Sequence, residues 1–302
     1  MELGWVTEPI PLTDEISNAM PLTPRFAQDE QHGLQDEKIR AIDDFKASGI
    51  NDILSTMDTA VPDTLDAFLG MATYYSLIQH EPDLLAFTAD FPHAYKHVGI
   101  PVRHAGFATI ILAPPSGPLH VATLRTQPFG SSRAPANWGR VTRFIQFILE
   151  RIFGVVIFVY VDDCFCIEVA TTVQSALKCF TGVCELFGFS LSPTKSQGPT
   201  KSLQLMGAEL SIFTGHVSAC LPERRRIDLI NDLKRIITFD QLNPAQAAKL
   251  RGRLGFAQSL LFGRVGRALL QPLTDRQYAR SFGRKHPLLR SYGNHSSGGA
   301  ML

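Results

Sequence analysis

The chain has 302 residues, 45% of them hydrophobic, and can bury one large core or two to three smaller subdomains. Its longest apolar run, residues 153–161, is far shorter than the roughly 20 residues that a membrane helix requires, and no basic start with an apolar run marks a signal peptide. The net charge of +1 conceals a gradient, because residues 1–70 carry 14 acidic and 4 basic side chains whereas residues 222–290 carry 15 basic and 5 acidic ones. We expect a soluble, intracellular protein without a membrane partner.

The first predicted elements lead to an apolar strand that ends at an aspartate. Residues 1–24 contain four prolines and little periodicity, which favours an extended lead-in over an independent domain. Residues 38–45 have the pattern of a short strand, and residues 62–77 have the apolar spacing of a helix. Residues 84–89 then form an apolar strand that runs into Asp90.

The middle of the chain alternates helices with strands. Residues 140–153 place apolar side chains on one helical face, and residues 155–161 are β-branched and aromatic, as in a buried strand. Asp162 and Asp163 supply a turn, residues 164–169 return as a strand, and residues 171–187 form a second helix that ends at Gly188. This order predicts helices packed on one face of an antiparallel sheet.

The last third is predicted to be helical, with apolar periodicity over residues 227–237 and 247–261 and a Gly- and Ser-rich, disordered end over residues 291–302. Its basic excess would suit a phosphate backbone, although a solvated helix surface explains the charge equally well. The five cysteines contain no CxxC pair and no zinc-finger spacing with histidines, which favours buried free thiols.

The strongest chemical signal is the pair Asp162 and Asp163, at the tip of an otherwise apolar hairpin. Two adjacent ionised carboxylates repel each other, so they are stable together when they are hydrated or when a divalent cation neutralises them. A plain hairpin turn is the alternative, but it favours Asp-Gly. Asp90, also at a strand end, provides a third carboxylate, and two-metal phosphoryl transfer requires such carboxylates from adjacent strands.

Several motifs carry a resemblance to reverse transcriptases, and it covers roughly residues 25 to 270. The segments at residues 90–95 (DFPHAY), 127–135 (QPFGSSRAP) and 160–163 (YVDD) resemble the palm motifs of that family in order and spacing. Residues 38–45 resemble its fingers motif, residues 191–195 its lysine-bearing loop and residues 205–210 its primer-grip hairpin. The fingers motif, the Pro-Phe-Gly segment and residues 250–258 resemble retrotransposon enzymes, particularly the tyrosine-recombinase (DIRS-like) class.

The resemblance implies an α+β fold, a right-hand polymerase with fingers, a ferredoxin-like antiparallel palm and a helical thumb. The implied boundaries are an extended lead-in (residues 1–24), fingers (25–87 and 101–127), palm (88–100 and 128–221), helical thumb or connection (222–280) and a disordered tail (281–302). The implied function is that of a retroelement-derived RNA-directed DNA polymerase core. It would use an RNA or DNA template with a primer and deoxynucleoside triphosphates; its oligomeric state stays open.

The resemblance also implies roles for individual residues. Asp90 and Asp162 would bind two Mg²⁺ ions, for which Mn²⁺ could substitute, and Asp163 would support them. Lys195 would donate a proton to the departing pyrophosphate, although a surface lysine is an equally good interpretation. Met206 and Gly207 would form the primer grip.

The nucleotide pocket has its own implied residues. Tyr95 would exclude a 2′-hydroxyl, unless it is a core tyrosine. Lys38 and Arg40 would bind the triphosphate, with an Arg40–Asp44 ion pair as the competing interpretation. Gly130, beside Phe129, would let the backbone approach the template–nucleotide pair closely.

Two alternative functions remain open. The first is a catalytically silent polymerase relic that acts as a nucleic-acid-binding module, suggested by the absence of ribonuclease H, protease or integrase signatures after residue 280 and by the acidic N-terminal region. The second is an RNA-directed RNA polymerase, which shares the chemistry of the palm.

Overall fold

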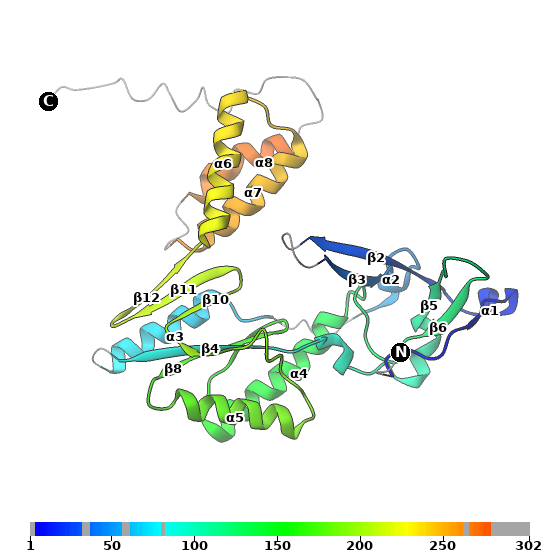
Figure 1. Cartoon of the computed structure of the whole chain (residues 1–302), viewed down its shortest axis with the longest axis horizontal. Coiled ribbons are helices and arrows are strands. Elements are labelled where there is room, and N and C mark those ends of the chain that lie inside the picture. Colours follow the sequence, from blue (N-terminus) through cyan, green and yellow to red (C-terminus); the bar gives the residue numbers. More distant parts are fainter. Residues whose placement is uncertain (1–3, 32–36, 56–60, 80–81, 262–265, 279–302) are drawn as a thin grey trace. The chain divides into compact units, whose positions relative to one another are not determined.

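The structure is a computed structural model that describes residues 4–31, 37–55, 61–79, 82–261 and 266–278, with only the backbone described for residues 29–31 and 37–40. The chain divides into two compact units, residues 1–201 with 214–216 and residues 202–213 with 217–302 (Figure 1). The predicted disordered tail, residues 281–302, lies outside the described residues.

A four-stranded antiparallel sheet forms the centre of the first unit, in the order β7-β8-β4-β9. The two inner strands are β4 (Leu84–Asp90) and β8 (Asp163–Val169), flanked by β7 (Phe158–Tyr160) and β9 (Gln197–Thr200). Helices α4 (Ala134–Ile148) and α5 (Val173–Leu186) cover one face of this sheet, and a π-helical turn (Leu149–Phe153) extends α4 (Figure 1). Phe87, Trp138 and Phe180 are fully buried in the core between them.

A third helix covers the opposite face of the same sheet. Phe68 of α3 (Leu65–Ile78) is fully buried, with its ring centroid 5.8 Å from that of Phe165 and 6.2 Å from that of Phe158. Helices α4 and α5 thus pack on one face, as the order of the elements predicts, whereas the sequence did not predict that α3 covers the other face. The physical reason is visible in β4, whose side chains are buried almost without alternation, so that both faces of the sheet need a cover.

A five-stranded sheet, in the order β1-β6-β5-β2-β3, completes the first unit. Its strands are β1 (Ile10–Pro11), β2 (Thr23–Gln31), β3 (Glu37–Asp43), β5 (Thr109–Leu112) and β6 (His120–Thr123). Within the segment predicted as an extended lead-in, residues 4–24 contribute β1, helix α1 (Asp14–Ala19) and the start of β2. Thr13 caps α1 by accepting a hydrogen bond from the backbone N–H of Ile16, a local signal that the proline count obscured.

The second unit combines a three-stranded sheet with helices, and the helices follow residue 222, as the periodicity there predicts. The strands are β10 (Ser202–Leu205), β11 (Ala208–Phe213) and β12 (His216–Cys220). The helices are α6 (Glu223–Phe239), α7 (Pro244–Ser259) and α8 (Gln271–Gln277). A capping box at Asn243 and Gln246 fixes the start of α7.

No helix within the described ranges is long and apolar enough to cross a membrane. Cys164, Cys166 and Cys184 are buried free thiols, and burial raises the pKa of each, which confirms the prediction for these three. Cys220 is exposed.

Candidate active site

Strand pairing brings Asp90 next to Asp163. In the antiparallel register of β4 and β8, Asp90 is the last residue of β4 and its partner is Asp163, the first residue of β8. Tyr160, at the end of β7, pairs with Asp163 from the other side. Because paired residues of neighbouring strands point to the same face, Tyr160, Asp163 and Asp90 form a row across the end of the sheet.

A tight two-residue turn carries the second aspartate of the pair. Val161 and Asp162 connect Tyr160 to its partner Asp163, and Val161 has a φ of 59°, in the left-handed region that β-branched residues avoid. Two hydrogen bonds hold this turn: the indole N–H of Trp138 donates to the Val161 carbonyl oxygen at 2.9 Å, and the Phe91 N–H donates to the Asp162 carbonyl oxygen at 3.3 Å. The fold therefore maintains a strained turn at the tip of the hairpin.

Lys195 pairs with Asp90. Its Nζ lies 3.0 Å from both carboxylate oxygens of Asp90, whose side chain is only 9% exposed. The loop that carries Lys195 is held by the same strand end, because the Ser192 N–H donates to the Asp90 carbonyl oxygen at 2.9 Å. The structure thus brings together two residues that the motifs identify separately.

The carboxyl group of Asp163 has a strongly perturbed pKa. Burial, together with the neighbouring carboxylates of Asp162 and Asp90, raises the pKa of Asp163 to about 6, and Lys195 offsets part of this increase. The perturbation shows that the three carboxylates interact and that negative charge accumulates at this end of the sheet.

The chemistry of these residues fits divalent cations, because carboxylate oxygens are the ligands that Mg²⁺ prefers and a cation would offset the repulsion that, after burial, raises the pKa of Asp163. Among the residues that the structure describes, no three His, Cys, Asp or Glu side chains are grouped closely enough to enclose a metal ion. Lys195 supplies the positive charge at Asp90 instead. A metal ion at Asp90 would therefore compete with Lys195 for the same two oxygens.

The predicted nucleotide-pocket residues Tyr95, Phe129 and Gly130 lie near one another. The ring centroids of Tyr95 and Phe129 are 5.3 Å apart. Gly130 follows with a φ of 109°, and a Cβ there would lie 1.9 Å from the carbonyl oxygen of Asp43. Gly130 is thus required by close packing against Asp43 at the end of β3; its predicted approach to a template–nucleotide pair stays a prediction.

The remaining predicted residues belong to other elements of the fold. Lys38 and Arg40 belong to β3, but their side chains are outside the described part of the chain, as is the competing Arg40–Asp44 ion pair. Met206 and Gly207 form the two-residue turn between β10 and β11 in the second unit, both with positive φ. The carbonyl oxygen of Gly207 accepts a hydrogen bond from Arg225 at 3.1 Å.

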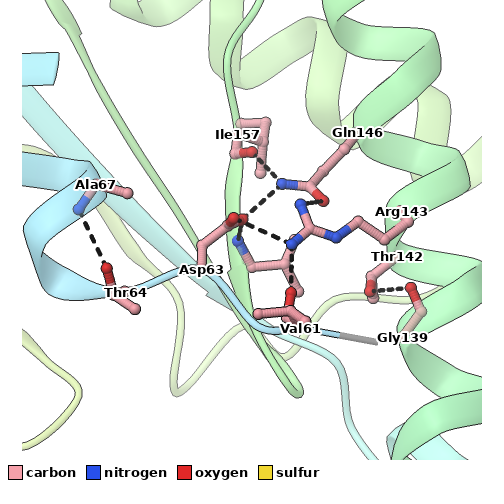
Figure 2. A network of polar contacts seen from close by, with 10 residues as sticks. Val61, Asp63, Thr64, Ala67, Gly139, Thr142, Arg143, Gln146 and Ile157 are labelled. Atoms are coloured by element: carbon pink, nitrogen blue, oxygen red, sulfur yellow. Dashed lines mark hydrogen bonds and ion pairs between the residues drawn. The ribbon is translucent and has the colours of Figure 1, made fainter. Parts of the chain in front are cut away.

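Sequence reasoning missed two ion pairs that support the site. Arg25 of β2 forms an ion pair with the buried carboxylate of Asp43 at 2.7 Å. The backbone of this same Asp43 packs against Gly130. Asp63 pairs with Arg143 of α4 at 3.2 Å and also binds Gln146, as Figure 2 shows. No local motif marks either pair, since the partners are 18 and 80 residues apart.

No family model matches the chain, and no curated protein matches it. Solved structures do resemble it. A foamy viral protease-reverse transcriptase bound to double-stranded DNA matches 91% of this chain with a TM-score of 0.64 and 15% identity, and another in complex with double-stranded DNA matches 91% with a TM-score of 0.59 and 14% identity. A foamy viral protease-reverse transcriptase bound to an RNA/DNA hybrid matches 90% with a TM-score of 0.60 and 14% identity.

The chain spans less than half the length of these neighbours, 41%, 48% and 31% respectively. At such low identity the likeness concerns the fold and not the activity. The mixed sheets and helices of this chain therefore have a reverse transcriptase-like fold.

Proposed function

We propose that this chain is the core of an RNA-directed DNA polymerase of retroelement origin that adds deoxynucleotides to a primed template by a two-metal mechanism. The observation that carries the proposal is the β4–β8 register, which places Asp90 opposite Asp163 at the strand end next to the Asp162 turn. The reverse transcriptase-like fold supports the same function. In this proposal the four-stranded sheet is the palm, the five-stranded sheet belongs to the fingers, and the second unit contains the primer grip and thumb.

Asp90, Asp162 and Asp163 would hold two Mg²⁺ ions, or Mn²⁺ in their place. When bound, such ions activate the attacking hydroxyl and stabilise the leaving group. Lys195 holds a proton at Nζ next to Asp90 and would supply it to the departing pyrophosphate. Tyr95, packed on Phe129, would restrict the sugar to one without a 2′-hydroxyl, and the fingers cations Lys38 and Arg40 would bind the triphosphate.

Primer extension on the purified chain, with an RNA template, Mg²⁺ and deoxynucleotides, tests the proposal. We expect incorporation by the wild-type chain and at least roughly a 10³-fold loss in Asp162→Asn, because a metal ligand is removed. Asp14→Asn, which changes an exposed aspartate of α1, is the matched control and should retain full activity.

The same assay separates the alternatives. A wild-type chain that binds the primed template but incorporates nothing would contradict the proposal and support the silent, nucleic-acid-binding relic. A preference for ribonucleotides over deoxynucleotides would support an RNA polymerase instead.

A further inference from the structure

The strand that precedes the Asp162 turn is short and lies at the edge of its sheet. β7 contains three residues, and β8 is its only neighbour within the described sheet. Val159, its central residue, is only 5% exposed, so its outward N–H and C=O groups need partners other than water. An unsupported edge of this kind would leave the strained turn at Val161 free to relax.

Asp63 supplies both partners of Val159. The Asp63 N–H donates to the Val159 carbonyl oxygen at 2.8 Å, and the Val159 N–H donates to a carboxylate oxygen of Asp63 at 2.8 Å. Residues 62–64, predicted as the first turn of a helix, instead run along β7, and α3 begins only after Thr64 caps it. Asp63 thus replaces a missing neighbouring strand.

Two side chains of α4 hold Asp63 in place, and we name Asp63, Arg143 and Gln146 the edge-strand network (Figure 2). Gln146, 5% exposed, donates from its amide nitrogen to Asp63 at 2.8 Å and to the Ile157 carbonyl oxygen at 2.6 Å. Arg143 donates to Asp63 at 3.2 Å, to the Gln146 side-chain oxygen at 2.9 Å and to the carbonyl oxygen of Val61. The network is therefore closed on itself, which keeps it rigid.

The contacts on the outer edge of this segment follow a period of two. Gln146 binds the backbone of Ile157, Asp63 binds that of Val159, and Trp138 binds that of Val161. In an extended strand, backbone groups two residues apart point the same way. One helix, α4, therefore supports this segment at three alternate residues: directly at Ile157 before the strand and at Val161 in the turn, and through Asp63 at Val159 within the strand.

We infer that Asp63 is a positioning residue for the Asp162–Asp163 turn: with Arg143 and Gln146 it fixes β7 so that both carboxylates can reach a shared divalent cation. The inference rests on the proposed function and extends it to a residue that touches neither substrate nor metal. Residues that orient metal ligands from behind typically contribute about 10–100-fold to metal affinity.

Mn²⁺ binding, followed by electron paramagnetic resonance on the full chain, tests the inference. Asp63→Ala should weaken Mn²⁺ binding by roughly 10-fold. Asp63→Asn keeps an acceptor oxygen for the Val159 N–H and should restore affinity to within about threefold of wild type, a rescue that general destabilisation would not produce. Asp83→Ala is the matched control: it also removes a carboxylate with an ion-pair partner, Lys201, just before β4 begins, and should leave Mn²⁺ affinity unchanged.

A wild-type affinity in Asp63→Ala would overturn the inference, as would equal losses in Asp63→Ala and Asp83→Ala. If Asp63→Ala does not fold, Arg143→Met decides, because Arg143 is 45% exposed and its loss is easier to tolerate. This variant should weaken Mn²⁺ binding in the same direction, and an unchanged affinity would again overturn the inference.

Failure of the proposed function gives a different result. If the wild-type chain binds no Mn²⁺, the metal site itself is refuted. Hydrogen exchange of residues 158–165 then decides the positioning role: Asp63→Ala must accelerate exchange of the Asp162–Asp163 turn while the folded core stays protected, and Asp83→Ala must not. Equal exchange in all three proteins would overturn the inference.

Discussion

The carboxyl group of Asp163 lies among two other carboxylates and a lysine, and this environment decides its chemistry. Burial, followed by Asp162 and Asp90, raises its pKa to about 6. The motif at residues 160–163 identifies the residue, but the size of the perturbation depends on Asp90 and Lys195, which are distant in the chain. At the residue scale, the sequence therefore predicts which groups take part, and the fold determines the environment that raises the pKa of Asp163.

This raised pKa predicts a pH dependence of stability in the metal-free chain. Between pH 4 and 6 the folded state binds more protons at Asp163 than the unfolded state, whose carboxyl titrates near 3.8, so this contribution is full below pH 4 and is lost as the pH rises through 6. In EDTA, the free energy of unfolding of Asp163→Asn should fall less than that of wild type between pH 4 and 7. We expect a difference on the order of 1 kcal/mol, reduced by solvent screening of this partly exposed group.

Urea unfolding followed by tryptophan fluorescence measures this difference, because Trp5 and Trp138 both belong to the first unit. Asp14→Asn should follow the wild-type pH profile. Parallel profiles for wild type and Asp163→Asn would contradict the prediction.

At the scale of elements, the contact between β3 and the loop before α4 depends on a glycine. The Asp43 N–H donates to the Phe129 carbonyl oxygen at 3.0 Å, and Asn51 bonds the Gly130 carbonyl oxygen at 3.0 Å. The resemblance predicted that Gly130 allows close approach to a template–nucleotide pair, and this stays a prediction; the structure shows a close approach to Asp43. The sequence could not predict that the approaching group is the backbone of Asp43, because periodicity carries no information about which loop meets which strand.

Gly130→Ala should therefore destabilise the first unit strongly. The new Cβ would lie 1.9 Å from the Asp43 carbonyl oxygen, and alanine is also disfavoured at a φ of 109°. Gly117→Ala is a matched control, since Gly117 has a φ of 100° but no atom within 4 Å of the added Cβ. The loss of unfolding free energy in Gly130→Ala should exceed that of the control by about 1–3 kcal/mol; equal losses in urea unfolding would show that the contact with Asp43 is not tight.

At the scale of the whole molecule, charge is distributed unevenly, with 15 basic and 5 acidic residues over residues 222–290. On the proposed function this region contacts the phosphates of the template and primer. The affinity for a primed template should then fall at least roughly tenfold between 50 and 200 mM salt and vary little with sequence. Binding that is independent of salt would contradict a phosphate-tracking role.

Two arginines of α6 allow a matched comparison in the same titration. Within the described residues Arg224 has no ion-pair partner, whereas Arg226 pairs with Glu223 at 2.6 Å. Arg224→Gln should reduce the slope of log affinity against log salt by about 1 if Arg224 contacts a phosphate, and Arg226→Gln should reduce it less. Equal slopes in wild type and Arg224→Gln would exclude Arg224 from the contact.

The sequence by itself determined the main helices and strands around the candidate site and the chemical groups predicted for it. Apolar periodicity identified α4, α5 and the strands β4 and β8, and the charge of Asp162 and Asp163 at an apolar hairpin tip identified the turn. These features are local: helical and strand periods, and a charge that contradicts its surroundings, are written in neighbouring residues.

Only the tertiary structure decided how these groups are held. The pairing of Lys195 with Asp90 joins residues 105 positions apart, and the support of β7 by Asp63 joins segments 96 positions apart. The cover that α3 gives to the second face of the four-stranded sheet also depends on long-range packing, between Phe68 and Phe165. Such contacts depend on which surfaces pack together when the chain folds. No local pattern in a single sequence identifies those surfaces.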